Sequence, residues 1–248
     1  MEELLEEVKF KNDIKLPKKI KMLLIVNYIV IAVLFFINIC ASIYFVKGNN
    51  TDYIFEDNIL KVVEIKVTDD EETFGYATGF FIDSNGKILT NKHVVVNSET
   101  NKNYENIYVR TATQEDYTKA EVIKVSDNDD LAIIKVDFAK TQYFKFASTA
   151  NNGEAVYTIG NPNGFGLSFS SGVISINSRN IIYNGKTINT IQTSLVINEG
   201  NSGGPVFNKN GKIVGIISFR LNDKEGNIIQ GCSFAIPVEK IKTFIDKW

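Results

Sequence analysis

The sequence predicts an all-β domain that follows one apolar helix and ends in a second, short helix. From about residue 58 the chain consists of short runs rich in valine, isoleucine and aromatic residues, separated by turns rich in asparagine, aspartate and glycine. Residues 22–46 carry no charge, and residues 238–247 have the apolar spacing of a helix. A chain of 248 residues with 44% hydrophobic content is large enough for one two-lobed globular unit.

The apolar segment predicts a membrane anchor. Its 25 residues are enough to cross a hydrocarbon core of ~30 Å as a helix. The segment is preceded by Lys15, Lys18, Lys19 and Lys21 and followed by Asp52, Glu56 and Asp57. The positive-inside rule therefore places the N-terminus in the cytoplasm and the folded domain outside. We therefore expect a cytoplasmic tail (1–21), a transmembrane signal-anchor helix (22–46), a polar linker (47–57) and a folded domain (58–248). The alternative is a cleaved signal peptide, whose apolar core is normally ~7–15 residues long and ends in a small-x-small site, and residues 22–46 fit neither condition.

The expected strands fall into two groups along the chain. Residues 83–86 (DSNG) and 208–211 (NKNG) have the composition of hairpin turns. The first group comprises residues 59–67, 74–82, 107–111, 120–125 and 131–136, with 87–90 just before His93. The second group comprises residues 155–159, 169–176, 186–194, 204–207, 212–219 and 228–236.

The segment Gly200-Asn201-Ser202-Gly203-Gly204-Pro205 has the pattern of a turn that presents a nucleophilic serine. Glycines on both sides of Ser202 allow a tight turn that exposes the hydroxyl and leaves the N–H groups of Gly200 and Ser202 free to face a developing oxyanion. A serine hydroxyl needs a base to take its proton, and the chain has one histidine, His93. The alternative is a glycine turn with a serine cap and no chemistry.

Asp130 is the candidate carboxylate that would orient the imidazole. It opens residues 130–136, whose apolar run predicts a largely buried strand, whereas Asp127, Asn128 and Asp129 have the composition of a turn. The chain order is His93, Asp130 and Ser202, with separations of 37 and 72 residues. That order matches the chymotrypsin-type arrangement and differs from the orders of other serine hydrolases.

Eight short segments together resemble HtrA/Deg-type proteases of the trypsin-like superfamily, in the family's order. They are residues 78–83 (TGFFID), 89–95 (LTNKHVV), 130–132 (DLA), 160–162 (GNP), 171–175 (SGVIS), 191–193 (IQT), 200–205 (GNSGGP) and 234–237 (FAIP). The resemblance implies two six-stranded antiparallel Greek-key β-barrels with a C-terminal helix. It also implies that His93 is base and acid, Asp130 the orienter and Ser202 the nucleophile, and that the protein is a homo-oligomer, a trimer. In the family, residues 160–166 correspond to a surface loop near the active site that influences its ordering.

Two departures from the family pattern stand out. Family members usually continue into peptide-binding PDZ domains, whereas this sequence ends at Trp248, so recognition of substrate termini through such a domain is not expected. The digestive branch has an aspartate just before its nucleophile that pairs with a freed N-terminus. Asn201 stands at that position, so activation by N-terminal cleavage is not expected either.

The resemblance places substrate contacts in two segments. The pocket for the residue before the cut is lined by the segment preceding the nucleophile, with Val196 and Ile197, and by a later strand with Ser218, Phe219 and Arg220. Val196, six residues before Ser202, is expected at the deepest position, where a cationic side chain would lose hydration without gaining a partner. We therefore expect cleavage after valine, isoleucine, leucine or alanine in unfolded or extended chains, which would pair with residues 218–220 as an added strand. Glu199 and Arg220 could turn inward, although a position at the rim is the simpler expectation.

Composition excludes several other classes. The net charge of −2 gives no basic footprint for nucleic acid, and one histidine with two distant cysteines leaves no zinc site or other metal site. No cofactor is predicted. The predicted function is a single-pass cell-membrane serine endopeptidase that acts on polypeptides in extracytoplasmic quality control or regulated proteolysis. The alternatives are a catalytically silent peptide-binding module of the same fold and a structural anchor.

Overall fold

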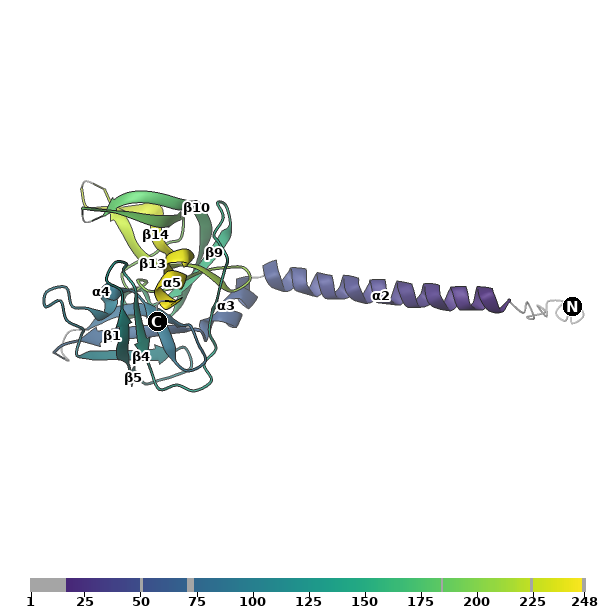
Figure 1. Ribbon diagram of the computed structural model, residues 1–248, viewed down its shortest axis with the longest axis horizontal. Coiled ribbons are helices and arrows are strands. Elements are labelled where there is room, and N and C mark those ends of the chain that lie inside the picture. Colours follow the sequence, from purple (N-terminus) through teal and green to yellow (C-terminus); the bar gives the residue numbers. More distant parts are fainter. Residues whose placement is uncertain (1–16, 50, 71–73, 184, 224, 247–248) are drawn as a thin grey trace, which may run out of the picture. The chain divides into compact units, whose positions relative to one another are not determined.

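The computed structural model describes residues 17–49, 51–70, 74–183, 185–223 and 225–246 (Figure 1). The chain divides into two compact units, residues 1–47 and 48–248, which are described separately. The expected cytoplasmic tail lies outside the described residues up to residue 16.

The described part of the first unit is helical. Helix α2 (Lys18–Asn49) contains the candidate span Lys18–Phe45, in which an 18-residue window has a mean hydropathy of 2.7 and is not buried in the structure. Its length and composition suffice to cross a membrane. The expected span of residues 22–46 therefore lies within one continuous helix.

The first sheet of the second unit contains seven strands in the spatial order β5-β4-β1-β2-β3-β7-β6. The strands of this sheet pair antiparallel, and the β2–β3 hairpin turns at Gly86, whose φ of +85° favours glycine. The strands are β1 (Val62–Thr68), β2 (Gly75–Phe81), β3 (Lys87–Thr90), β4 (Asn106–Thr111), β5 (Thr118–Lys119), β6 (Glu121–Val125) and β7 (Ala132–Lys135). The short helix α4 (Lys92–Val95) follows β3 directly.

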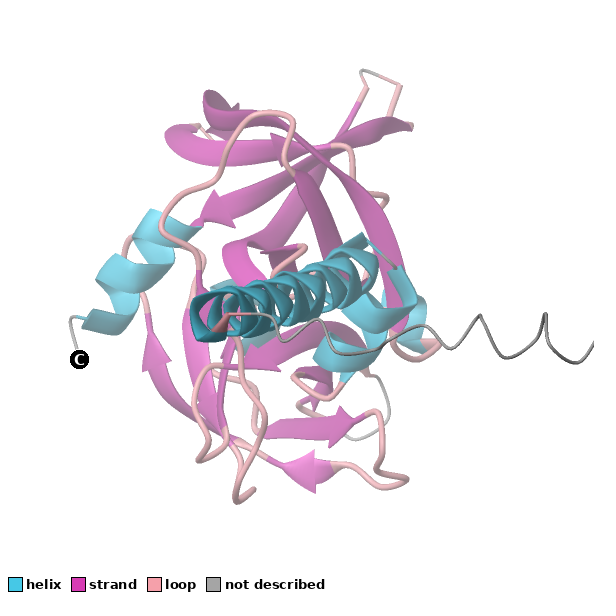
Figure 2. Ribbon diagram, turned by 90° about the vertical axis from the view of Figure 1, so that its right-hand side faces the viewer, coloured by secondary structure: helices cyan, strands magenta, loops and turns pink. Residues whose placement is uncertain are grey.

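The second sheet also contains seven strands, in the order β12-β9-β10-β11-β14-β13-β8, and an additional β12–β13 pairing closes the first six of these into a ring. Figure 2 shows how strands make up most of the second unit. The strands are β8 (Lys145–Phe146), β9 (Ala155–Gly160), β10 (Ser168–Tyr183), β11 (Lys186–Thr193), β12 (Pro205–Asn208), β13 (Lys212–Asn222) and β14 (Ile228–Pro237). A 3₁₀ turn, η1 (Pro162–Gly164), connects β9 to β10, and helix α5 (Val238–Asp246) follows β14.

The architecture confirms the all-β class and differs from the expected details. Each sheet has seven strands where six were expected, because the two-residue strand β5 adds one strand to the first sheet and β8 adds one to the second. The sheets are not wholly antiparallel, since β8 runs parallel to β13. Residues expected to form a polar linker form helix α3 (Thr51–Ile59) instead, because Ile54 and Asn58 are buried against the second unit to which the helix belongs.

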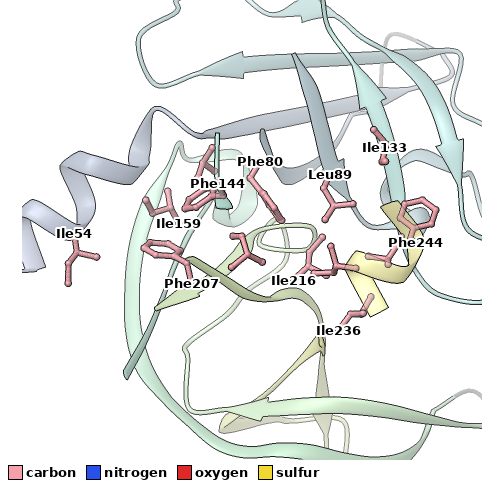
Figure 3. Packing of buried hydrophobic residues seen from close by; sticks show 14 residues of the cluster. Ile54, Phe80, Leu89, Ile133, Phe144, Ile159, Phe207, Ile216, Ile236 and Phe244 are labelled. Atoms are coloured by element: carbon pink, nitrogen blue, oxygen red, sulfur yellow. The ribbon is translucent and has the colours of Figure 1, made fainter. Parts of the chain in front are cut away.

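A shared hydrophobic core joins the two sheets (Figure 3). Phe80 and Leu89 enter it from the first sheet, and Phe207 and Ile216 enter it from the second. Phe144 packs edge-on against Phe80 with ring centroids 5.7 Å apart. The core therefore fixes the two sheets against each other, and the polar residues at the sheet ends take defined relative positions.

Candidate active site

His93 lies on helix α4, just past the end of β3. Val94 and Val95 are buried and hold the helix, whereas the His93 side chain is 49% exposed. Asp130 lies just before β7, and Thr90 pairs with Ala132 where β3 meets β7. Because His93 and Asp130 lie at the same end of these adjacent strands, their side chains meet.

The Asp130 carboxylate makes two bonds to His93. Its Oδ2 lies 2.7 Å from Nδ1 of the ring, and its Oδ1 accepts the backbone N–H of His93 at 3.0 Å. A carboxylate accepts but does not donate, so Nδ1 carries the proton and Nε2 is the basic nitrogen of the neutral ring. The geometry therefore sets both the orientation and the tautomer of the imidazole.

Two further residues hold Asp130. The Ser218 hydroxyl, on β13 of the second sheet, donates to Asp130 Oδ2 at 2.9 Å. The fully buried Asn91 donates through Nδ2 to the backbone carbonyl of Asp130 at 2.9 Å. Asp130 is thus held at its carboxylate by a residue of the second sheet and at its backbone carbonyl by Asn91, which follows β3 of the first sheet.

Ser202 lies in the turn before β12, and this turn requires glycine on both sides. Gly200 has a φ of +92° and Gly203 a φ of +81°. A Cβ on Gly200 would lie 2.1 Å from the Asn161 carbonyl, and one on Gly203 would lie 2.2 Å from the Thr78 carbonyl. Only glycine fits both positions, as the sequence pattern predicts.

The turn is fixed by backbone bonds to both sheets. The Ser202 carbonyl accepts from the N–H of Thr78 on β2 at 3.0 Å, and the N–H of Gly203 donates to the Ile217 carbonyl at 3.0 Å. The Ser202 hydroxyl makes a long contact, 3.5 Å, with the carbonyl of Ser218. Among the described residues it makes no hydrogen bond to His93. Ser218 therefore links the two halves, since its hydroxyl contacts Asp130 while its carbonyl contacts Ser202.

The peptide groups around Gly200 leave donors free in the turn. The Glu199 carbonyl accepts from the N–H of Asn163 in turn η1 at 2.8 Å, and the Gly200 carbonyl accepts from the Thr78 hydroxyl at 2.7 Å. The C=O and N–H of a trans peptide point in opposite directions, so the N–H of Gly200 points away from η1. In the part of the chain that the structure describes, the N–H groups of Gly200 and Ser202 donate to no protein acceptor.

The family model of a trypsin-like peptidase domain matches residues 77–216, which include all three candidate residues. The chain belongs to the trypsin-like peptidases.

Its relatives bear out the resemblance to HtrA-type proteases. A probable periplasmic serine endoprotease DegP-like from Pseudomonas putida (strain W619) is 36% identical over 170 residues, which cover 68% of this chain and 33% of the relative. The mitochondrial serine protease HTRA2 of Drosophila pseudoobscura pseudoobscura is 30% identical over 220 residues, covering 81% of this chain and 49% of the relative. This trypsin-like peptidase thus spans between a third and a half of these relatives. The solved structure of the HtrA-type protease AlgW with a tripeptide superposes with a TM-score of 0.67 at 26% identity, covering 76% of this chain and 60% of that one.

The candidate substrate residues of this trypsin-like peptidase lie on β13 and before the nucleophile turn. Ser218 contacts Asp130, and Phe219 stacks on Phe234 with ring centroids 5.2 Å apart. Ile197 is buried, but Val196, expected at the deepest position, is 56% exposed. The Arg220 side chain turns inward to residues 197–199, where a rim position was the simpler expectation.

Several residues that hold the site were not assigned a role from the sequence. Thr78 is fully buried, and its hydroxyl donates to the Gly200 carbonyl while accepting the N–H of Asn161 at 2.9 Å. Asn163 has a φ of 52° and reaches Glu199. The family resemblance indicated the loop at residues 160–166, but Thr78 is 122 residues from Gly200, and such long-range partners leave no local pattern.

Proposed function

We propose that this chain is a membrane-anchored serine endopeptidase in which Ser202 is the nucleophile, His93 the general base and acid, and Asp130 the orienting carboxylate. The observation that carries the proposal is the pair of bonds from Asp130 to His93, at 2.7 Å and 3.0 Å, which leaves Nε2 as the basic nitrogen. Membership of the trypsin-like peptidases supports the same assignment.

The reaction follows from these atoms. The Ser202 hydroxyl turns from the Ser218 carbonyl to Nε2, gives its proton to His93 and forms a bond to the substrate carbonyl carbon. The negative oxygen of the tetrahedral intermediate accepts from the N–H groups of Gly200 and Ser202. His93 then donates the proton to the leaving amine as the peptide bond breaks. Water repeats the two steps on the acyl-enzyme and restores the Ser202 hydroxyl.

An extended polypeptide is the substrate that the surface of β13 favours. The strand pairs with β12 only as far as Ile216, whereas it pairs with β14 as far as Asn222. Among the described strands, β14 alone borders residues 218–222, so this stretch offers an open edge for a substrate strand. A cavity of about 260 Å³, bordered by Asp130, Ser218, Phe219 and Ile188, adjoins that edge and would receive substrate side chains farther from the cut. Only extended or unfolded chains can add such a strand.

Labelling of the full chain in detergent tests the chemistry. A fluorophosphonate probe should modify Ser202 in the wild type and in the exposed-serine control Ser148→Ala, and should not modify Ser202→Ala. Ser202→Ala and His93→Ala should each reduce casein digestion on the order of 10⁴-fold or more, and the double variant should be little worse because the residues act as a unit. A chain that binds unfolded casein but is neither labelled nor proteolytic would be the silent peptide-binding module instead.

Membrane anchoring through α2 is the second part of the proposal. It is supported by the candidate span Lys18–Phe45 and by the lysines before residue 22, which favour a cytoplasmic N-terminus and an extracytoplasmic peptidase. The periplasmic designation of the DegP-like relative supports a role in extracytoplasmic quality control or regulated proteolysis. Protease added to intact cells should remove an epitope placed after residue 50 and spare one placed at residue 5. A mature protein that begins near residues 43–48 would instead establish a cleaved signal peptide.

A further inference from the structure

Arg220 turns its side chain across the end of β13 toward the segment that precedes the nucleophile turn. Its Nη1 donates to the Ile197 carbonyl at 3.2 Å and to Asn198 Oδ1 at 3.2 Å, and its Nη2 lies 3.8 Å from Glu199 Oε1. The Arg220 side chain is 22% exposed and that of Glu199 is 85% exposed. The pair with Glu199 is therefore weak, and the bonds to residues 197 and 198 fix the guanidinium.

The space that this guanidinium borders is small and open to solvent on one side. One wall is residues 195–197, the second is Arg220, and the third is residues 228–233 of β14; we call this space the Arg220 cavity. Ser233 pairs with Arg220 across the β13–β14 ladder and donates to the Leu195 carbonyl at 3.0 Å, which ties β14 to the first wall. The cavity measures about 10 Å³, room for roughly one water molecule.

The Arg220 cavity lies where the proposed reaction needs a side-chain pocket. Arg220 is two residues after Ser218, whose carbonyl contacts the Ser202 hydroxyl, and Ile197 is five residues before Ser202. A substrate strand on residues 218–220 would direct the side chain before the cut into this space. A leucine or phenylalanine side chain does not fit in 10 Å³ unless the guanidinium leaves the Ile197 carbonyl.

We propose that Arg220 is a specificity-determining residue that limits the side chain before the cut to small residues, alanine above all. This rests on the proposed function and narrows the preference for medium apolar residues expected from the sequence to the small end of that range. The bonds to residues 197 and 198 hold the guanidinium across the cavity, so a larger substrate side chain must break them. Its positive charge also disfavours lysine or arginine at the same substrate position.

The test compares kcat/KM for peptides that differ only in the residue before the cut, using alanine, valine, leucine and phenylalanine. The full chain in detergent is assayed as wild type, Arg220→Ser, Arg220→Lys and the control Arg179→Ser, which removes the same charge from an exposed position on β10. Arg220→Ser should raise the leucine-to-alanine ratio about tenfold or more, since one methylene in an apolar pocket changes kcat/KM about 10–200-fold. The leucine-to-alanine ratio of Arg220→Lys should lie between those of the wild type and Arg220→Ser, because an ammonium keeps the charge but lacks the planar fork of the guanidinium. Arg179→Ser should match the wild type.

A ratio within one variant is insensitive to partial loss of folded protein, so weaker folding cannot imitate the shift. A wild type that prefers leucine or phenylalanine to alanine, or an Arg220→Ser variant with an unchanged ratio, would overturn the inference while Ser202 labelling and casein digestion persist. Absence of labelling and of digestion in every variant would overturn the proposed function, and the inference with it.

Discussion

The first sheet holds its part of the site through charge, whereas the second sheet holds its part through backbone geometry. His93 is oriented by the Asp130 carboxylate, which accepts from the ring and the backbone of His93 and from the Ser218 hydroxyl. Ser202 is positioned by glycine torsions and by backbone bonds to Thr78 and Ile217. Substitutions in the first half should therefore impair chemistry while sparing the fold, whereas substitutions around the nucleophile turn should affect both.

The same contrast extends beyond the site. Within the described residues, Glu64 on β1 is the only buried charged residue, and it is bound by Arg110 on β4 and by Tyr117, which directly precedes β5. The buried polar groups described in the second sheet are neutral, and Thr158 and Ser233 are examples. Among the described residues, buried charge is thus confined to the first sheet, and substitutions in the two sheets should differ accordingly.

The largest effect is expected from removing the charge of Asp130. Asp130→Asn should lower kcat about 10⁴-fold, because the amide can donate to Nδ1 and so favour the tautomer without a basic Nε2. Ser218→Ala removes one hydrogen bond to the same carboxylate and should lower kcat about ten- to a hundredfold, since hydrogen bonds to charged groups contribute about 1.5–3 kcal/mol. Steady-state kinetics on casein or a peptide check both, and thermal unfolding should be little changed in Asp130→Asn. Equal losses in the two variants would contradict the view that the carboxylate acts mainly by fixing the tautomer.

A smaller effect, shared between stability and activity, is expected at Thr78. Thr78→Val leaves the Gly200 carbonyl and the Asn161 N–H without their partner, which should lower the free energy of unfolding by about 1–3 kcal/mol. Displacement of the turn should also lower kcat/KM by about ten- to a hundredfold, because small misplacements in a site are costly. Chemical denaturation and kinetics measure the two losses.

Thr158→Val is the matched control for that substitution. Thr158 on β9 is also buried, but its hydroxyl has no hydrogen-bond partner in the described part of the chain. Its removal should leave activity unchanged and the free energy of unfolding unchanged or raised by up to about 1 kcal/mol. If both valine variants lose activity alike, the hydroxyl of Thr78 has no special role in holding the turn.

The sequence predicted the parts of the site that depend on residue type. One histidine, one serine between glycines and one aspartate before an apolar strand were enough to choose His93, Ser202 and Asp130, and the first and last of these meet in the structure. Strands with clear alternation and hairpin turns were also located closely. The strand β10 was underestimated, since it continues to Tyr183 past the polar run at residues 177–180 (NSRN).

What the sequence did not predict depends on partners distant along the chain. Residues 51–59 are polar enough for a linker, yet they form α3 because Ile54 reaches the shared core and Asn58 bonds back to its carbonyl at 2.7 Å. The inward turn of Arg220 depends on acceptors 22 and 23 residues away. Such contacts exist only after the sheets have formed, so local pattern and composition give no sign of them.

The smallest effect is expected in the alkaline stability of the first sheet. The Tyr117 hydroxyl donates to Glu64 Oε2 at 3.0 Å, and burial, followed by the Glu64 charge and its hydrogen bond, raises the pKa of Tyr117 to about 12. An unfolded tyrosine has a pKa of about 10, so the folded state favours the neutral phenol. That contribution is fully present below about pH 10 and is lost as the pH rises toward about 12. The thermal midpoint of the wild type should therefore fall more steeply over this interval than that of Tyr117→Phe, which cannot ionise there. Tyr143→Phe, which removes an exposed hydroxyl, should follow the wild type, and parallel curves for all three proteins would show that alkaline unfolding begins elsewhere.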